Sequence, residues 1–467
     1  METPRQINFI NEEEIFNAIL EGKKASKEEV LEIISKAKEC KGISLKEAAV
    51  LLQINNPELL NELYSTAGYI KEKIYGKRIV FFAPMYVSNI CANNCLYCAF
   101  RKDNTELERI VLSPDDIKKD TEALLKQGHK RVLAVAGEHP KYSGIEYLEK
   151  VVNAIYSSEW NGMKIRRVNV NCAPLSVEHF KRLKETNIGT YQIFQETYHY
   201  DTYKKMHPSG PKTDMSWRLS AFDRAIEGGI EDLGLGALFG LYDYRFEVLA
   251  MFQHAYHLDS KFKIGPHTIS IPRLEPALNA PVANHIPYAI NDDMMRKIVS
   301  VLRIAVPYTG IILSTRERAE FRNELISLGV SQVSAGSRVG PGEYSKEEGT
   351  VKTKDQFLIA DERSLPEMID MLVNGDYIPS FCTACYRKGR TGEAFMDIAK
   401  HGDIHNMCNP NALISFREYL HDFANEEEQQ KGNNLIEKHL SKLEPKTKKI
   451  TKEMIEKIDK GEKDQYL

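Results

Sequence analysis

The chain has 467 residues, of which 42% are hydrophobic and 28% charged, as in a globular protein with a substantial core. Lys and Arg total 63 against 66 Asp and Glu, so the net charge of −3 gives no electrostatic basis for binding nucleic acid or an anionic membrane. The polar, acidic start lacks signal-peptide features, and no apolar run is long enough to cross a bilayer. We therefore expect a cytoplasmic protein with no nucleic-acid and no membrane partner.

Residues 1–78 carry apolar side chains at helical spacing, which predicts an N-terminal helical region. From 79 to 375 apolar strands alternate with amphipathic helices. The predicted strands are 78–88, 131–137, 166–171, 190–195, 232–238, 267–272, 310–314 and 330–336. Eight such repeats over this length favour an α/β fold, a TIM-type (βα)8 barrel. A doubly wound open sheet is the structural alternative.

The repeat stops near residue 376. The stretch 378–395 has a loop-like composition, and helical patterns follow it to the end of the chain. We expect residues 376–467 to form a mainly helical C-terminal domain that binds an iron–sulfur cluster, since this part contains three of the eight cysteines.

Six of the eight cysteines form two tight groups of three, a pattern typical of metal ligands kept reduced in the cytosol. Cys40 and Cys172 stand alone, and we interpret each as a small buried apolar residue. Cys91, Cys95 and Cys98 have C-x3-C-x2-C spacing.

The first group would hold three irons of a 4Fe-4S cluster and leave the fourth open to S-adenosylmethionine (SAM). Reduction of its sulfonium would then give a 5′-deoxyadenosyl radical. A zinc site is the alternative, but zinc usually takes four protein ligands and no fourth ligand lies nearby in the sequence. The spacing resembles the signature of the radical SAM superfamily.

This resemblance implies the SAM-binding residues, which follow the strands whose ends would meet at the barrel mouth. The segment AGEHP resembles the family's GGE motif, with Ala136 in place of its first Gly. The implied SAM contacts are Tyr97, Gly137, Glu138, Glu196 and Arg218. For Glu196 and Arg218 the alternative is a surface ion pair.

Hydroxyl and guanidinium groups follow the seventh and eighth predicted strands: Ser314, Thr315, Arg316, Arg318, Ser334, Ser337 and Arg338. Such groups suit the carboxylate of an amino-acid substrate, because Arg holds a carboxylate in bidentate fashion. We take Ser314, Arg316, Arg318 and Ser334 as the catalytic candidates. For Ser314 and Thr315 the alternative is capping of the following helix.

The second group, Cys382, Cys385 and Cys408, has C-x2-C-x22-C spacing and no obvious fourth ligand. It fits a structural zinc, an electron-relay cluster or a second catalytic cluster with an open iron.

The whole chain resembles the tyrosine-cleaving radical SAM enzymes. The matching stretches are MYVSNICANNCLYCAF, AGEHP, FQETYH, GLGALFGLYDYRFE and STRERAEFR. The thiazole-pathway tyrosine lyase shares this barrel, whereas the extension CTACYRKGRTGEAFM with its distant third cysteine is similar to the branch that matures FeFe-hydrogenases.

The resemblance implies that L-tyrosine is cleaved at Cα–Cβ to p-cresol and dehydroglycine, which gives carbon monoxide and cyanide. It implies a C-terminal 4Fe-4S cluster with an additional labile iron, bound by free cysteine and by His267. The implied partners are an electron donor and other hydrogenase maturation proteins. The competing hypotheses are a tyrosine lyase for thiazole synthesis and a non-catalytic iron–sulfur scaffold.

Overall fold

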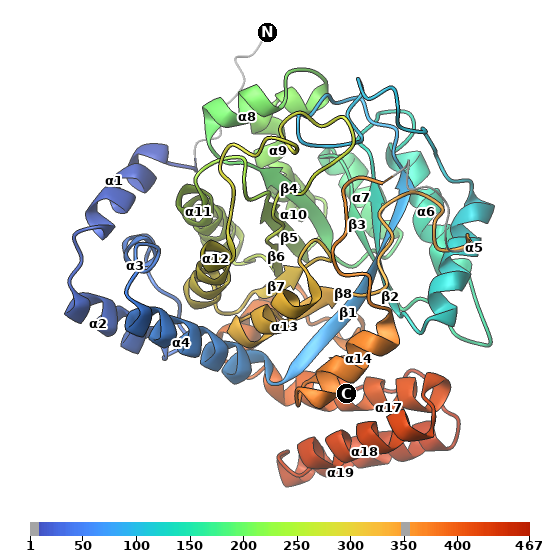
Figure 1. Ribbon diagram of the computed structural model, residues 1–467. Helices are drawn as coiled ribbons and strands as arrows, with labels where there is room; N and C mark the ends of the chain where they lie inside the picture. Colours follow the sequence, from blue (N-terminus) through green and yellow to red (C-terminus); the bar gives the residue numbers. More distant parts are fainter. Residues whose placement is uncertain (1–8, 347–354) are drawn as a thin grey trace.

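The computed structural model describes residues 9–346 and 355–467. Eight parallel strands close into a barrel, with β8 and β2 both hydrogen-bonded to β1 (Figure 1). The strands are β1 (Arg78–Ser88), β2 (Arg131–Ala136), β3 (Arg167–Asn171), β4 (Tyr191–Glu196), β5 (Leu233–Ala237), β6 (Thr268–Ser270), β7 (Gly310–Leu313) and β8 (Gln332–Ser334). The predicted TIM-type barrel is confirmed, and the open doubly wound sheet is excluded because the sheet closes on itself.

Helices connect successive strands; most of them lie on the outside of the barrel, and α8 lies above the ends of the strands (Figure 1). They are α5 (Pro114–Lys126), α6 (Ile145–Ser157), α7 (Val177–Glu185), α8 (Tyr200–Met206), the short η1 (Pro211–Thr213), α9 (Met215–Leu219), α10 (Ala221–Glu227), α11 (Tyr244–Phe262), α12 (Asp292–Ala305) and α13 (Ala319–Leu328). Capping decides where several of them begin: the Ser113 hydroxyl accepts from Asp116 N, and Pro114 occupies the first turn of α5.

The N-terminal region packs against the outer helices of the barrel. It consists of α1 (Glu12–Gly22), α2 (Lys27–Ala37), α3 (Leu45–Leu51) and α4 (Pro57–Tyr75). α1 and α3 contact α11, and α4 contacts α12 and α13. The predicted N-terminal helical extension is thereby confirmed.

The C-terminal region lies below the end of the barrel at which the strands start (Figure 1). Its elements are α14 (Leu365–Asn374), β9 (Ile378–Ser380), α15 (Ala384–Arg387), α16 (Gly392–Lys400), α17 (His405–Phe423), α18 (Glu426–Leu440) and α19 (Pro445–Asp459). The loop-like expectation for 378–395 is wrong in part, because β9 pairs in parallel with the start of β1. The barrel sheet therefore continues past residue 375, where we predicted a boundary.

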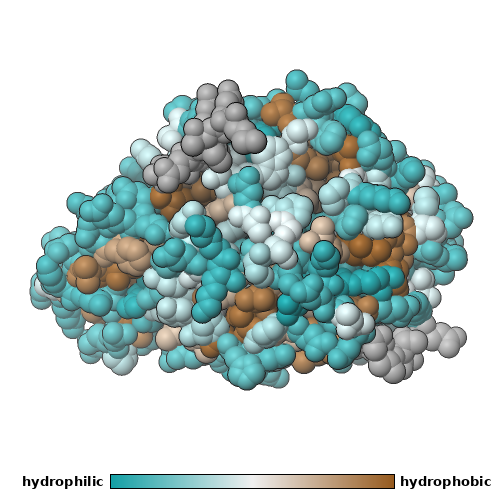
Figure 2. Space-filling model, turned by 90° about the horizontal axis from the view of Figure 1, so that it is seen from above, coloured by the Kyte–Doolittle hydropathy of each residue, from teal (hydrophilic) through white to brown (hydrophobic). Residues whose placement is uncertain are grey.

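No helix among residues 9–346 and 355–467 is long and apolar enough to cross a membrane. Seen from above, the surface is mostly hydrophilic, with separate apolar patches (Figure 2).

A buried carboxyl on α11 makes stability depend on pH. Glu247 is fully buried and accepts from the Thr197 hydroxyl and Tyr198 N. Burial raises its pKa to about 8, although both hydrogen bonds oppose the shift. Between the ordinary Glu pKa and about 8, the unfolded chain releases a proton that the folded chain keeps. The carboxyl's stabilising effect is therefore complete at low pH and is lost as pH rises to the folded-state pKa.

For Glu247→Gln we expect a free energy of unfolding that varies less with pH. Wild type should lose up to about 1.4 kcal/mol per pH unit between pH 5 and 8 from this group, and the variant should lack that slope. Anaerobic urea denaturation of both proteins across this range measures the difference. Parallel curves would show that Glu247 is already ionised in the fold.

Candidate active site and second cysteine site

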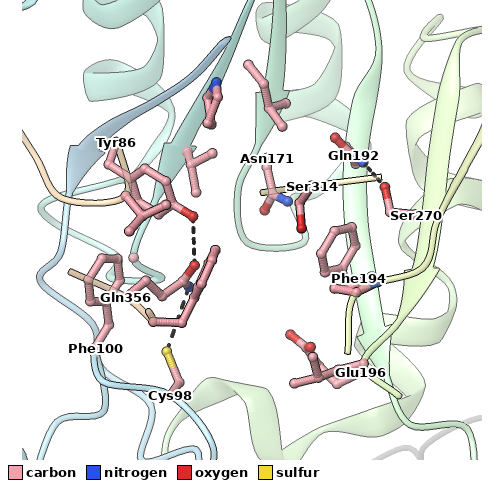
Figure 3. A pocket seen from close by; sticks show the side chains of 18 of the residues that line it. Tyr86, Cys98, Phe100, Asn171, Gln192, Phe194, Glu196, Ser270, Ser314 and Gln356 are labelled. Carbon is pink, nitrogen blue, oxygen red and sulfur yellow. Dashed lines mark hydrogen bonds between the residues drawn. The ribbon is translucent and has the colours of Figure 1, made fainter. Parts of the chain in front are cut away.

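A cavity of about 180 Å³ lies inside the barrel, toward the end where the strands finish (Figure 3). Its lining includes all three cysteines of the first group and the acidic and basic residues predicted to contact SAM. The lining residues used below are Tyr86, Cys91, Cys95, Tyr97, Cys98, Gly137, Glu138, Asn171, Gln192, Glu196, Lys212, Arg218, Ser270, Ser314, Arg316, Ser334, Gln356 and Phe357. Most residues predicted for the first site are thus brought together, from the ends of β1, β2, β4, β7 and β8 and the segments that follow them.

The loop after β1 carries the first cysteine group over the cavity. Backbone bonds fix it: Ala92 N donates to Glu138 O at 2.8 Å, and Leu96 N donates to Met206 O at 3.1 Å. Gln356 Nε2 lies 3.8 Å from Cys98 Sγ and links it to Tyr86, whose hydroxyl donates to Gln356 Oε1 at 2.8 Å (Figure 3).

The donor set fits an iron–sulfur cluster with one open iron. Three soft sulfur donors share one cavity, and burial raises the pKa of the Cys98 thiol to about 11, so a metal is needed to hold it as thiolate. In the described residues, no three His, Cys, Asp or Glu side chains converge on a single ion-sized point. The fit therefore rests on the sulfur donors and the shared cavity.

Two acids and two bases form a buried network beside the cysteines. Glu138 Oε1 accepts from Arg218 Nη1 at 2.8 Å, and Glu196 Oε1 accepts from Lys212 Nζ at 2.6 Å. All four side chains are at most 15% exposed, so the alternative of a surface ion pair for Glu196 and Arg218 is wrong. Burial alone would raise the pKa of Glu138, but Arg218, Lys212 and their hydrogen bonds outweigh it, and the pKa is lowered.

Glu196 has a backbone conformation that residues other than Gly rarely adopt. Its φ is +72°, and the register between β4 and β5 shifts between Phe194 and Glu196. Such a conformation costs about 1–2 kcal/mol and is common at functional sites. The shift places the Glu196 carboxylate in the cavity, on the side facing Cys98 (Figure 3).

Tyr97 lies between the cysteines and α8. Its hydroxyl is 2.8 Å from His207 Nε2, and Lys212 Nζ lies 5.6 Å from the centre of its ring. The ring is 6% exposed and lines the cavity, as expected of an aromatic group beside a bound adenine.

Gly137 allows the end of β2 to approach the cysteine loop. A Cβ at this position would lie 2.6 Å from Ile90 O, a backbone atom that cannot move without moving the loop. For Gly137→Ala we expect SAM affinity to fall about ten- to a hundredfold, because overpacking of this kind costs about 1–3 kcal/mol. Equilibrium dialysis with the reconstituted protein measures this.

Ala136→Gly is the matched control, since it restores the first Gly of the motif and adds no atom. SAM affinity in the Gly137 variant equal to wild type would show that the loop does not depend on this close approach.

The hydroxyl and guanidinium candidates divide into two sets. Ser314, Arg316 and Ser334 line the cavity, and the Arg316 guanidinium stacks over Phe357 at 3.6 Å and donates to Arg273 O. Arg318 is outside it: the side chain is 59% exposed and pairs with Asp292 at 2.6 Å, because residue 318 caps α13 on the outer surface. This position does not support the predicted catalytic role.

The capping alternative for Ser314 and Thr315 is wrong, because α13 begins at Ala319 with Arg318 as its N-cap residue. Ser314 instead lines the cavity and points into it (Figure 3).

Several lining residues were not predicted. Lys212 lies in the short η1, whose composition gives no signal in the sequence, and the fold of this segment places it next to Glu196. Gln192 and Ser270 form the opposite end of the cavity from Cys98, where Gln192 Nε2 donates to Ser270 Oγ at 2.6 Å (Figure 3). Alternation along β4 and β6 predicts that such residues face inward, but gives no reason to select them.

The second cysteine group lies at the opposite end of the barrel. Cys382 follows β9, Cys385 is on α15, and Cys408 is on α17. Burial raises the pKa of Cys385 to about 12, and the nearby Cys408 and Cys382 add to the shift. Three sulfur donors again fit a cluster with one open iron.

His267 lies just before β6, at the end of the barrel that faces this second group. Its Nδ1 is 3.2 Å from Asp232 Oδ2, and its ring stacks on Phe395 at 4.2 Å. Burial lowers the pKa of His267, which favours the neutral imidazole that binds metals. The Tyr386 ring, next to Cys385, stacks near it at 6.4 Å.

Comparison with known proteins agrees with this architecture. Residues 85–253 match the radical SAM superfamily, and residues 270–378 match the Biotin and Thiamin Synthesis associated domain. The chain is 31% identical to the 2-iminoacetate synthase of Escherichia coli (strain K12) over 312 residues, which are 66% of this chain and 79% of that protein.

Two solved structures of HydG are similar over nearly the whole chain. One, described as a maturase of the [FeFe]-hydrogenase, is 49% identical and superposes with a TM-score of 0.95, covering 98% of this chain and 100% of that one. The FeFe-hydrogenase maturase HydG from Carboxydothermus hydrogenoformans is 44% identical with a TM-score of 0.82, covering 95% and 97%.

The barrel, the cysteine loop and the charged cavity define a radical SAM enzyme. Within that superfamily, the chain belongs to the HydG family.

Proposed function

We propose that this enzyme cleaves the Cα–Cβ bond of L-tyrosine to p-cresol and dehydroglycine, and converts the glycine fragment to carbon monoxide and cyanide for hydrogenase maturation. The observation that carries the proposal is the pair of cysteine triads at opposite ends of one barrel. The first supports the chemistry of the radical SAM superfamily, which residues 85–253 match, and the second supports the maturase activity described for HydG.

Cys91, Cys95 and Cys98 would hold a 4Fe-4S cluster which, when bound, supplies the electron that splits SAM to a 5′-deoxyadenosyl radical. The network beside them offers both signs of charge to the methionine part of SAM. Its amino group would bind the acids Glu138 and Glu196, and its carboxylate would bind Lys212 and Arg218. Tyr97 would lie beside the adenine of SAM, and Gly137 lets the end of β2 approach the cysteine loop.

Arg316 is the proposed partner of the tyrosine carboxylate. It lines the cavity and forms no ion pair with any carboxylate in the described residues. Its planar guanidinium stacks on Phe357, which fixes the orientation of the group. Ser314 and Ser334 lie on neighbouring strand ends, where their hydroxyls are available to the substrate's polar groups. The position of the cavity inside the barrel limits access of water to the reactive fragment.

The second triad would hold a cluster carrying an additional labile iron, ligated by His267 and a free cysteine. Dehydroglycine would be decomposed there, and the iron with its carbon monoxide and cyanide would pass to other maturation proteins. An electron donor is a further partner that the chemistry requires.

The test is the product profile from tyrosine. Anaerobically reconstituted enzyme, with about nine irons per chain, is incubated with dithionite, SAM and tyrosine. We expect 5′-deoxyadenosine, p-cresol, cyanide and carbon monoxide together. p-Cresol without carbon monoxide would favour the thiazole-type lyase, and iron-replete protein that gives no 5′-deoxyadenosine would favour a scaffold.

A further inference from the structure

Three buried arginines begin three adjacent strands at the end of the barrel near the second cysteine group. Arg78, Arg131 and Arg167 are the first residues of β1, β2 and β3, and they are 8%, 7% and 7% exposed. Each is an even number of residues away from a residue of the same strand that lines the first cavity: Phe82, Leu133 and Asn171. Because side chains alternate along a strand, all three arginines face the barrel interior.

The hydrogen-bonding capacity of these guanidiniums is only partly used. Arg131 Nη2 donates to Cys382 O at 2.7 Å, and Arg167 stacks over Tyr386 at 3.9 Å and donates to Ile188 O. In the part of the chain that the structure describes, Arg78 Nε and Nη1, Arg131 Nε and Arg167 Nε have no acceptor. A buried N–H without an acceptor is unfavourable, so these donors point to a ligand.

The charges in this layer do not balance. None of the three arginines forms an ion pair with a carboxylate among the described residues, and the acid of the layer, Asp232, lies against His267 instead. Cys382 and Cys408 lie near these arginines. Three thiolates shared with a 4Fe-4S core would offset only part of the three positive charges. A buried positive excess is costly unless an anion is bound.

We propose that Arg78 and Arg131 bind the carboxylate of a small amino-acid-derived ligand beside the C-terminal cysteine triad. The proposal rests on the proposed function, which supplies two such carboxylates: the glycine fragment of tyrosine and a free cysteine. The guanidinium fork matches a carboxylate in bidentate fashion. Arg167 and Tyr386 form one wall of the site, because the Arg167 guanidinium packs on the Tyr386 ring. The Tyr386 hydroxyl lies 3.1 Å from Thr190 Oγ1, which fixes the ring against the barrel.

A binding experiment tests this without catalysis. In a full-length chain with Cys91, Cys95 and Cys98 replaced by Ser, only the C-terminal cluster remains after reconstitution. Glyoxylate, a stable mimic of the glycine fragment, is labelled with ¹³C in its carboxylate and titrated into this protein. The EPR spectrum of the reduced cluster and its ¹³C hyperfine coupling are followed. L-Cysteine labelled in the same way is the second arm.

We expect saturable binding, and an increase in Kd of about tenfold or more in Arg78→Gln and Arg131→Gln. Arg78→Lys and Arg131→Lys should give intermediate values, because the charge is kept but the fork is lost. Arg417→Gln is the matched control: it removes an arginine from the same helix as Cys408, paired with Asp459. Iron content equal to the parent protein establishes that each variant folds.

The two arms identify the source of the carboxylate. Arginine dependence for glyoxylate alone assigns the site to the glycine fragment, and dependence for cysteine alone assigns it to the free amino acid. Unchanged affinity for both ligands in the Gln variants overturns the proposal.

The intact enzyme gives an independent check. If the fragment is the ligand, both Gln variants should keep p-cresol formation but release more glyoxylate, which forms when water adds to the imine C=N bond and ammonia leaves. If the wild-type enzyme forms no p-cresol from tyrosine, the proposed function itself is contradicted. If the Gln variants keep the wild-type ratio of carbon monoxide to p-cresol, a role for these arginines in fragment capture is contradicted.

Discussion

Replacing Cys382, Cys385 and Cys408 together by Ser should abolish carbon monoxide formation and leave p-cresol formation largely intact. The physical reason is the separation of the two sites. The first cavity is built from strand ends and from the loop after β1, and none of its lining residues comes from the second triad. The variant is assayed anaerobically with SAM and tyrosine, with p-cresol measured by chromatography and carbon monoxide by haem-protein binding.

Cys40→Ser is the matched control, because this thiol is half-buried and lies outside both triads. It should form both products at wild-type rates. The triple variant should also retain fewer irons, about four per chain. If carbon monoxide persists at the wild-type ratio to p-cresol, the second triad is not its source.

The barrel was predictable because its signal repeats. Each strand is a short apolar run followed by an amphipathic helix, and the pattern recurs eight times, so an error of a residue at one boundary does not alter the topology. The strand β9 was missed because Ile378–Ser380 is three residues long and contains a proline, and it pairs only at the edge where β1 extends below the barrel.

The first cysteine group could be placed in one cavity from its spacing, because its three members lie on one short loop, whereas Cys408 of the second group comes from α17 and Cys385 from α15. Co-location of the second group was not predictable in this way. The charged network was not predictable either, since Lys212 and Arg218 approach Glu138 only after two loops from different strands have folded over the cavity. The same limit applies to Arg78 and Arg131. In the sequence each is simply a polar residue at the start of an apolar strand. Only closure of the barrel places both beside Cys382.

The seventh strand shows how a correct location can still give a wrong residue. Arg316 and Arg318 are two positions apart in a turn, and the sequence does not distinguish which of them faces the barrel mouth. The structure turns Arg316 inward and leaves Arg318 outside on Asp292, because α13 starts immediately after Arg318 and orients that residue outward.

This pair of arginines gives the second large prediction. For Arg316→Gln we expect kcat/KM for tyrosine to fall about a hundredfold or more, since loss of one partner of a buried charge pair costs about 2–5 kcal/mol. SAM binding should be unchanged, because Arg316 forms no contact with Glu138 or Arg218 in the described residues. Cleavage of SAM without tyrosine consumption should therefore continue, as measured by 5′-deoxyadenosine formed per p-cresol.

Arg318→Gln is the matched control, with the same chemical change two residues away. Its 59% exposed side chain pairs with Asp292 at the surface, where an ion pair contributes about 0–1 kcal/mol, so kinetics close to wild type are expected. The reverse result, with a large loss in the Arg318 variant and little in the Arg316 variant, would show that the turn rearranges when substrate binds. The tyrosine carboxylate would then be held from outside the cavity, and Ser314 and Ser334 would lose their proposed role as well.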